Sequence, residues 1–325
     1  MSAAAVTHFI HQGLFFSSPE ELLAAALPLL REGLAAGDAV ILACRDEYAA
    51  LLVDAIGPHP RITRLPPVRV CARTATAIED YHEMVAQRVA VGARRVEVVG
   101  EPNDFGANPD AWAECSRFEA ICNVTLAMCP LTSTCTFDVG ALPEPVIKDL
   151  ASAHPFLLTP AGRIRNERYV DPATFLRRFA AGPDPVEETS PTVAFAAVTD
   201  LHQVAALRNQ LRAALDAHEV DLPIMADVVA AVQELVVNGL VHGRPPVRVR
   251  LWTPPERLVC TVTDAGPGFD DPVAGYMRPD PDDAFSPGSG TGLWLARQLC
   301  DRVETARTPA GFTVRLITSA PAART

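Results

Sequence analysis

The sequence predicts an α/β protein of two domains, the first built on a mostly parallel sheet and the second a two-layer α/β sandwich. Three observations predict this. Helix and strand signals alternate along the first half, a segment rich in proline and acidic residues breaks the pattern at 181–192, and two helices followed mainly by hairpin strands make up the second half. We therefore expect domains at 1–181 and 193–320, joined by a linker at 182–192.

The first domain begins with a clear helix signal. Ser18-Pro19-Glu20-Glu21 forms a capping box with proline at the first helical position, and Gly37 ends the apolar periodicity that follows. The later elements are expected in alternation: strand 39–43, helix 47–56, strand 68–71, helix 77–91, strand 96–99, helix 110–128 and strand 133–137. Strands separated by helices favour a parallel sheet that is covered on both faces.

The second domain has a different order of elements. We expect a strand at 193–198, helices at 200–218 and 222–241, a strand pair at 247–253 and 257–264, a helix at 291–301 and a last strand at 312–318. Two helices followed mainly by hairpin strands indicate one layer of helices on a mixed or antiparallel sheet.

Composition excludes several classes of function. The chain has 28 basic and 39 acidic side chains, a net charge of -11, which argues against a nucleic-acid surface. Lys148 is the one lysine and follows Ile147, so no glycine-rich phosphate loop ending in lysine exists. No apolar run reaches the roughly 18 residues of a membrane span, and no secretory signal opens the chain, so we expect a cytoplasmic location.

The cysteines do not predict a metal ribbon or a redox motif. None of the 8 forms a C-x-x-C pair. Cys115, Cys122 and Cys129 recur every seven residues, which places them on one helical face, and we interpret them as small core side chains.

A helix in the second domain carries polar residues at intervals of four. Glu234, Asn238 and His242 share one face because four residues make slightly more than one turn. The amide oxygen of Asn238 can bind Mg²⁺, and the Glu234 carboxylate can orient or deprotonate an attacking nucleophile. A solvated polar face that ends at Gly243 is the alternative interpretation.

Two glycine-rich segments follow this helix. In Asp264-Ala265-Gly266-Pro267-Gly268, a carboxylate at a strand end can accept a hydrogen bond from an amine such as that of adenine, and the glycines let the backbone approach a flat ring. Gly288-Ser289-Gly290-Thr291-Gly292-Leu293 runs into a helix, where glycines expose backbone N–H groups to phosphate. Each segment alone is also compatible with an ordinary turn.

Together, the run E-x-x-x-N-x-x-x-H-G, then D-x-G-x-G-F, then G-x-G-T-G-L resembles the GHKL (Bergerat) ATP-binding fold of histidine kinases, gyrase B, MutL-type proteins and anti-sigma serine kinases. The resemblance covers about 195–318 and implies ATP and Mg²⁺ as cofactors. It implies that Glu234 is the catalytic base, Asn238 the Mg²⁺ ligand and Asp264 the adenine reader. The remaining implied cofactor-binding residues are Gly266, Gly268, Gly290, Thr291, Gly292, Leu293 and Thr313.

Two further points follow from this resemblance. The mobile lid over ATP would fall at 274–287. Gly239 departs from the family, which usually has alanine after the asparagine, and we expect it to loosen the helix by up to about 1 kcal/mol.

The anti-sigma serine kinases are the branch of this fold that fits best. A histidine kinase needs a phosphoacceptor histidine on a two-helix hairpin, and His218 lies too close to Glu234 to leave space for one. The opening Phe195-x-x-x-Thr199-Asp200-Leu201 also looks like the start of the short anti-sigma kinase domain.

The first domain resembles the MEDS sensory domain over residues 8–160. The matching features are His8-Phe9-Ile10, Gly100-Glu101-Pro102, Arg117-Phe118-Glu119-Ala120, Cys135-Thr136-Phe137-Asp138 and His154-Pro155. This implies a RecA-like α/β sensor of small molecules. Glu101 and Asp138 follow strand ends, where open sheets bind ligands, and Glu119 and His154 are expected in the same crevice. The alternative is that these groups cap helices and satisfy buried backbone.

We therefore expect a bacterial regulator in which a small-molecule sensor controls an ATP-dependent protein serine kinase or anti-sigma factor. The expected partner is a sigma factor or a STAS-type anti-anti-sigma protein, with neither nucleic acid nor membrane, and a homodimer is left open. Two alternatives remain: a non-catalytic binding module gated by ATP, and a histidine-kinase-like sensor.

Overall fold

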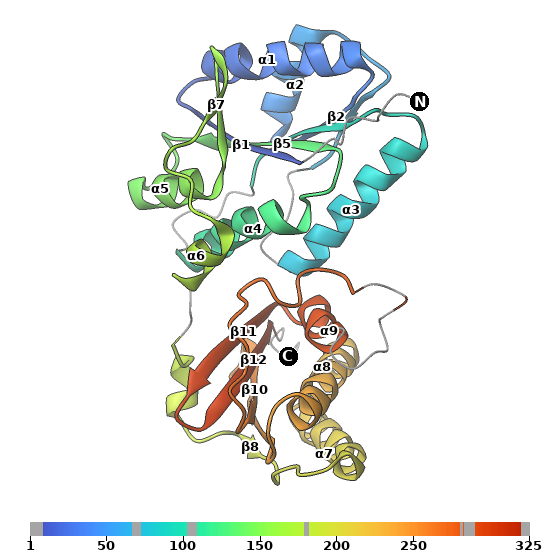
Figure 1. Cartoon of the computed structure of the whole chain (residues 1–325), viewed down its shortest axis with the longest axis vertical. Coiled ribbons are helices and arrows are strands. Elements are labelled where there is room, and N and C mark those ends of the chain that lie inside the picture. The colour runs from blue at the N-terminus through green and yellow to red at the C-terminus, as the bar shows by residue number, and fades with distance from the viewer. Residues whose placement is uncertain are drawn as a thin grey trace. The chain divides into compact units, whose positions relative to one another are not determined.

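The computed structural model describes residues 9–66, 73–102, 109–178, 182–279, 282 and 290–319. The chain divides into two compact units, Met1–Leu176 and Arg177–Thr325. Both are α/β units, as predicted (Figure 1). The strand expected at 68–71 lies outside the described residues.

The strands of the first unit form one sheet. Within the described residues it has seven strands in the order β3-β2-β4-β5-β1-β6-β7. Their bounds are β1 Ile10–Phe16, β2 Ala39–Ala43, β3 Ile62–Arg64, β4 Val96–Gly100, β5 Leu131–Asp138, β6 Phe156–Thr159 and β7 Gly162–Arg165. All neighbours pair in parallel except β6 and β7. The mostly parallel sheet predicted from the alternating pattern is confirmed.

Helices cover both faces of this sheet. Figure 1 shows α1 and α2 on one face and α3 and α4 on the other. The bounds are α1 Pro19–Ala36, α2 Asp46–Ile56, α3 Thr74–Ala90, α4 Pro109–Thr125, α5 Glu144–Ala153 and α6 Pro172–Arg177. The Ser18 hydroxyl accepts a hydrogen bond from the Glu21 N–H, and Gly37 closes α1 with a φ of 88°. These are the two ends that the sequence predicts.

The interior of the first unit has an apolar layer and a polar region. Leu14, Leu22, Leu30, Val40 and other aliphatic side chains pack β1 and β2 against α1 and α2. Cys115, Cys122 and Cys129 are buried, as expected. On the α4 side, however, β1 and β5 bury the polar residues His11, Ser133 and Cys135, while Gln12 donates to Thr134 on the other face.

The second unit is a two-layer sandwich. Its described strands form a five-stranded antiparallel sheet in the order β11-β12-β10-β9-β8. The bounds are β8 Val193–Ala194, β9 Arg248–Trp252, β10 Arg257–Asp264, β11 Arg302–Thr308 and β12 Gly311–Ser319. The helices α7 Val204–Ala217, α8 Leu222–Val241 and α9 Thr291–Leu299 pack on one face of this sheet through one apolar core.

Helix α8 is the central helix of that core. By length and composition it is apolar enough to cross a membrane. It also buries Val228, Val232, Leu235 and Val236 in the cluster shared with the sheet. We therefore interpret its apolar character as that of a core helix.

The segment expected to be a linker is packed against the second unit. Pro185–Glu188 forms a 3₁₀ helix, and Val186 packs on Trp252, Val259 and Ile317, on the sheet face opposite the helices. Asp184 pairs with Arg257, and Glu187 pairs with Arg315. Its proline and acidic residues predicted a linker with nothing to bury. In the structure, Val186 packs on the sheet, and the carboxylates of Asp184 and Glu187 form ion pairs with sheet arginines.

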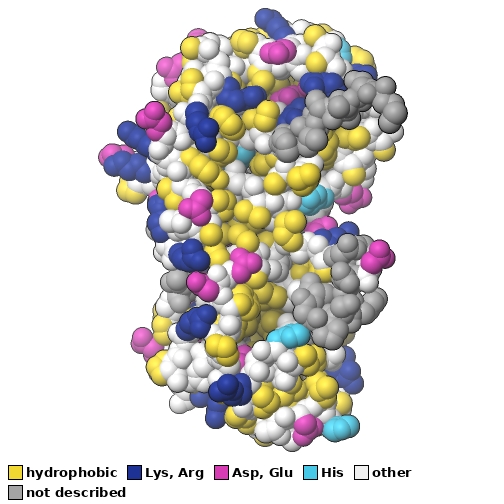
Figure 2. All heavy atoms as spheres, viewed as in Figure 1, with side chains coloured by type: hydrophobic (Ala, Val, Ile, Leu, Met, Phe, Trp, Pro, Cys, Tyr) yellow, Lys and Arg dark blue, Asp and Glu magenta, His cyan; other side chains and the backbone are white. Residues whose placement is uncertain are grey.

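Charge is spread over the surface. On the face seen in Figure 2, the coloured basic and acidic side chains are interspersed and do not gather into a basic patch. The net charge of the chain is -11.

Candidate functional site

The polar face of α8 lies next to the start of α9. A Cβ atom added at Gly292 would lie 2.6 Å from Asn238 Nδ2 and 3.1 Å from Asn238 Oδ1, so the two residues are in direct contact. Glu234 is one helical turn before Asn238, and both side chains are half-buried. Among the residues that the structure describes, neither side chain forms a hydrogen bond, so both remain available to a ligand.

The C-terminal end of α8 also packs against Asp264 at the end of β10. A Cβ atom at Gly243 would lie 2.4 Å from Asp264 Oδ1, and one at Gly239 would lie 3.4 Å from Asp264 Cβ. Asp264 is buried, and its Oδ1 atom accepts hydrogen bonds from the backbone N–H groups of Arg244 (3.1 Å) and Gly266 (2.6 Å). Two fixed donors hold this carboxylate in one orientation, with Oδ2 left for a ligand.

Gly239 allows this close approach. A Cβ atom at position 239 would lie 2.9 Å from Val247 Cγ2, which is closer than ordinary packing allows. The absence of a side chain, which the sequence suggested would loosen the helix, instead lets α8 lie against β9 and β10.

The start of α9 offers backbone N–H groups. Gly290 precedes the helix with a φ of 78°, and no side chain caps the first turn in the part of the chain described. The uncapped N–H groups and the helix dipole favour an anion here. Gly288 and Ser289 of the same motif, and half of the predicted lid, lie outside the described residues. In the described part of the lid, the Ala274 carbonyl accepts a hydrogen bond of 3.0 Å from Arg297 on α9.

Thr313 is the predicted site residue that does not join this group. Side chains alternate along β12, and Phe312 and Val314 belong to the core on the helix side. Thr313 therefore points to the other face, where its hydroxyl lies 2.9 Å from that of Thr263. Phe312 occupies the helix side instead, in contact with Gly268 and 4.9 Å from the Phe269 ring.

The structure thus brings most of the predicted nucleotide residues together. Asn238 touches Gly292, and Asp264 touches Gly243 and Gly266, all around the C-terminal half of α8. Gly290, Thr291 and Leu293 adjoin Gly292 at the start of α9. This arrangement holds one carboxamide, one oriented carboxylate and a helix N-terminus on one side of the sheet, which suits a magnesium-bound nucleotide.

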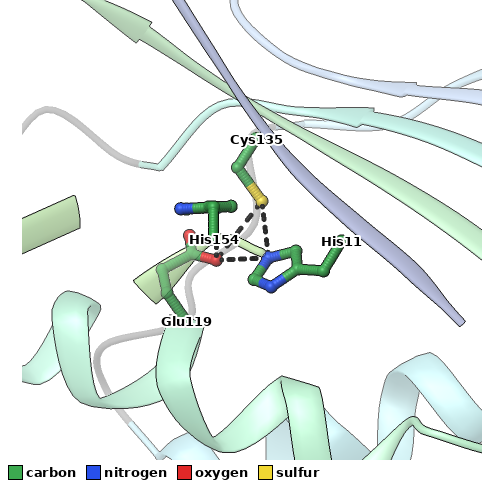
Figure 3. A group of neighbouring side chains, drawn as sticks. All are labelled: His11, Glu119, Cys135 and His154. Atoms are coloured by element: carbon green, nitrogen blue, oxygen red, sulfur yellow. Dashed lines mark hydrogen bonds and ion pairs between the residues drawn. The ribbon is translucent and has the colours of Figure 1, made fainter. Parts of the chain in front are cut away.

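A second polar site lies in the first unit. Glu119 on α4 and His154 after α5 meet there, with 3.5 Å between Glu119 Oε2 and His154 Nε2. His11 on β1 and Cys135 on β5 complete the group, at 3.0 Å and 3.3 Å from the same oxygen (Figure 3). All four side chains are buried.

Two of the predicted sensor residues lie elsewhere. Glu101 accepts hydrogen bonds from the Arg45 backbone N–H (3.0 Å) and guanidinium, and Asp138 accepts one from the Gly140 N–H (2.9 Å). Both therefore have the capping and pairing roles of the alternative interpretation. His11 and Cys135 were missed because nothing in the sequence gives the pairing of β1 with β5, although both are polar positions in apolar strands.

Burial dominates the proton chemistry of this buried group. It lowers the pKa of His11, and the neighbouring His154 adds to that effect. It raises the pKa of the Cys135 thiol, which the Glu119 charge also raises. Burial would raise the pKa of Glu119 too, but the two neighbouring histidines hold it well below its usual range. Cys135 is therefore not an activated nucleophile.

The comparisons with known proteins agree with these two units. Residues 197–318 match the histidine kinase-like ATPase domain, and residues 10–155 match MEDS, the methanogen/methylotroph, DcmR sensory domain. The chain is also similar to a crystal structure of the RsbU and RsbW domains of a Mycobacterium tuberculosis protein, at 21% identity and a TM-score of 0.30. That match covers 41% of this chain and 34% of the other, about a third of its length. No curated protein matches the chain. The chain thus joins a region similar to the MEDS sensory domain to a region similar to the histidine kinase-like ATPase domain.

Proposed function

We propose that this chain is a cytoplasmic regulator whose ATPase domain binds Mg·ATP and transfers phosphate to a serine of a partner protein. The partner would be a sigma factor or a STAS-type anti-anti-sigma protein, and a small molecule on the MEDS domain would control the transfer. One observation carries the proposal: α8 touches the start of α9 through Asn238 and the end of β10 through Gly239. One helix therefore connects a metal ligand, a phosphate cradle and an adenine-reading carboxylate.

Each side chain has a task in that reaction. Asn238 is suited to hold Mg²⁺, which supplies charge neutralisation of the phosphates when bound. Glu234, one turn away and without a partner among the described residues, is suited to orient or deprotonate the serine hydroxyl. Asp264 Oδ2 is suited to accept a hydrogen bond from the exocyclic amine of adenine, because Oδ1 is already held by two backbone donors.

Calorimetry on the intact chain tests the binding step. We expect Asn238→Ala to abolish measurable Mg·ATP binding, because the amide oxygen is the proposed metal ligand. Asn209→Ala, which removes an exposed asparagine from α7, is the matched control and should bind like the wild type. Equal ATP affinity in the wild type and the Asn238→Ala protein would contradict the proposal.

Labelled ATP tests the transfer step. We expect Glu234→Ala to keep Mg·ATP binding and to lose transfer to an anti-anti-sigma protein from the same genome, and the wild type to label a serine. Binding without labelling by the wild type would favour the non-catalytic module. An acid-labile label would favour a histidine kinase. His218 has a structural role that argues against the latter, since its Nδ1 lies 2.8 Å from the Ala214 carbonyl at the end of α7.

A further inference from the structure

The buried group in the MEDS domain is built from four separate parts of the chain. The set consists of His11 on β1, Glu119 on α4, Cys135 on β5 and His154 after α5. One donor atom from each lies within 4.8 Å of all the others, and the exposed fractions range from 0% to 7%. Figure 3 shows the four side chains converging from different elements on one point. Side chains with lone pairs gather here, and none of the four is a lysine or an arginine.

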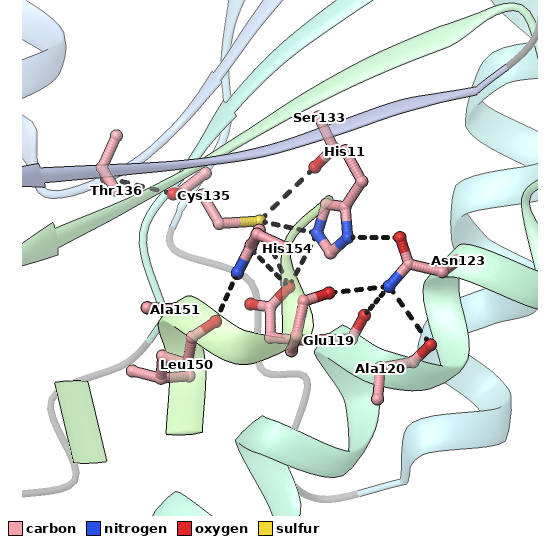
Figure 4. A network of polar contacts seen from close by, with 12 residues as sticks. His11, Glu119, Ala120, Asn123, Ser133, Cys135, Thr136, Leu150, Ala151 and His154 are labelled. Atoms are coloured by element: carbon pink, nitrogen blue, oxygen red, sulfur yellow. Dashed lines mark hydrogen bonds and ion pairs between the residues drawn. The ribbon is translucent and has the colours of Figure 1, made fainter. Parts of the chain in front are cut away.

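The hydrogen bonds of His154 fix which ring nitrogen faces the group. Its Nδ1 lies 2.6 Å from the Leu150 carbonyl oxygen (Figure 4). A carbonyl only accepts, so Nδ1 carries the proton, and in the neutral ring Nε2 presents its lone pair to Glu119. This buried Nε2 has no hydrogen bond within the described residues.

The same orientation holds for His11. Its Nδ1 lies 3.1 Å from Asn123 Oδ1. The amide of Asn123 cannot be reversed, because its Nδ2 donates to backbone carbonyls of Glu119 (3.1 Å), Ala120 (3.3 Å) and Ala153 (2.8 Å). The His11 Nδ1 therefore donates to Oδ1, and its Nε2 lone pair also faces the group (Figure 4). Histidines that bind metals are held in this way, by a second hydrogen bond on the far nitrogen.

The inner contacts then need a shared cation. His11 Nε2 lies 3.0 Å from Glu119 Oε2 and 3.4 Å from Cys135 Sγ. The imidazole nitrogen and the carboxylate oxygen can only accept a hydrogen bond, so the thiol of Cys135 is the one donor among these three atoms. One protonated imidazole would satisfy His11 but leave His154 Nε2 without a partner. One metal ion would satisfy all four groups.

Spacing and charge fit such an ion. Bonds of about 2.0 to 2.3 Å to a tetrahedral centre place ligand atoms roughly 3.3 to 3.8 Å apart. The closest contacts here are 3.0, 3.3, 3.4 and 3.5 Å. A thiolate, a carboxylate and two neutral imidazoles carry two negative charges, which a divalent ion balances in a site that excludes water.

We propose that His11, Glu119, Cys135 and His154 bind one divalent transition-metal ion of the zinc class. Two imidazole nitrogens and a thiolate favour such ions over Mg²⁺ or Ca²⁺. Four protein ligands fill a tetrahedral site, so the ion joins β1, β5, α4 and the end of α5 and couples metal occupancy to the stability of the MEDS domain. This inference concerns the MEDS domain and is independent of the proposed ATP binding in the second unit.

Cobalt substitution tests the ligand set. The full chain is stripped of metal and titrated with Co²⁺ in the absence of nucleotide. We expect saturation at one ion per chain, the strong visible bands of tetrahedral cobalt, and a thiolate-to-cobalt band in the near ultraviolet that Zn²⁺ abolishes. Cys135→Ser should lose the near-ultraviolet band. Cys122→Ser, the matched control, removes another buried cysteine of the same unit and should keep it. Absence of stoichiometric binding by the wild type, or a retained band in Cys135→Ser, would overturn the proposal.

Asn123 provides a second test that leaves the ligands in place. As a positioning residue it holds the His11 ring, so Asn123→Ala should weaken Zn²⁺ binding by about 10- to 100-fold in competition with a chromogenic chelator. Asn209→Ala, in the other unit, should leave the affinity unchanged. Unchanged Zn²⁺ affinity in a folded Asn123→Ala protein would show that Asn123 supports structure alone and would count against the site.

Discussion

At the scale of single residues, the nucleotide site depends on the orientation of Asp264. Asn at this position would keep an acceptor for the backbone donors but turn an NH₂ group toward the adenine amine. We expect Asp264→Asn to weaken Mg·ATP binding by about 10- to 100-fold, the equivalent of a charged hydrogen bond of roughly 1.5 to 3 kcal/mol. Thr313→Val is the control, since Thr313 points to the opposite face of the sheet. Calorimetry in which Thr313→Val weakens binding as much as Asp264→Asn would contradict this placement.

Whether the sequence predicts that two site residues lie together depends on how far apart they are in the chain. Glu234 and Asn238 share a helix, so their common face follows from spacing alone. Glu119 and His154 do meet, as expected of two residues facing one crevice, at 3.5 Å. His11 and Cys135 join them because β1 pairs with β5, two strands that are far apart in the sequence. Local sequence patterns do not predict which distant strands pair. Thr313 lies on the sheet face opposite Phe312, because successive side chains of a strand alternate between faces.

At the scale of elements, the 3₁₀ segment Pro185–Glu188 belongs to the second unit. Glu187 pairs with Arg315, whose side chain is 3% exposed and also donates to Glu304 at 2.7 Å. Removing Glu187 leaves a buried guanidinium with one fewer partner. We expect Glu187→Ala to lower the free energy of unfolding by about 1.5 to 3 kcal/mol, measured by urea denaturation. The neighbouring exposed Glu188→Ala should change it by less than about 0.5 kcal/mol. Equal effects of the two changes would show that the segment is not part of this unit.

Elements with end signals in their own sequence were predicted best. Helix α1 begins after Ser18 and ends before Gly37, and α8 and β10 have the expected bounds. Strands β1 and β11 were not predicted. In β1, Gly13 and the polar pair His11 and Gln12 interrupt the apolar pattern, because His11 contacts Glu119 on one face of the sheet and Gln12 donates to Thr134 on the other. In β11 charged residues pair along an antiparallel neighbour, as Glu304 does with Arg315. Both strands are specified by partners distant in sequence.

At the scale of the whole molecule, the pH dependence of stability should reflect Glu97. Burial raises the pKa of this β4 carboxyl to about 7, against the opposing effects of Thr132 and Arg95. The unfolded chain has a carboxyl pKa of about 4.3, so the native state binds more protons between pH of about 4.3 and 7. Stability from this group therefore falls as pH rises through that window.

A neutral replacement checks the sign of this effect. We expect Glu97→Gln to remove the loss of stability that deprotonation of Glu97 causes. The difference in the free energy of unfolding, variant minus wild type, should therefore rise from pH 5 to pH 8 by up to about 3 kcal/mol. Urea denaturation at several pH values measures the difference. Glu32→Gln, at an exposed position, should run parallel to the wild type. A constant difference between the wild type and Glu97→Gln would show that Glu97 does not titrate in this window.

The central claim is that α8, β10 and the start of α9 form one nucleotide site. A crystal structure of the intact chain with Mg²⁺ and a non-hydrolysable ATP analogue tests it most directly. The account predicts adenine against the Asp264 carboxylate, the metal on Asn238 Oδ1 and phosphates at the backbone N–H groups of Thr291 and Gly292. An analogue bound on the opposite face of the sheet, beside Thr313, or bound without contact to Asn238 would contradict it.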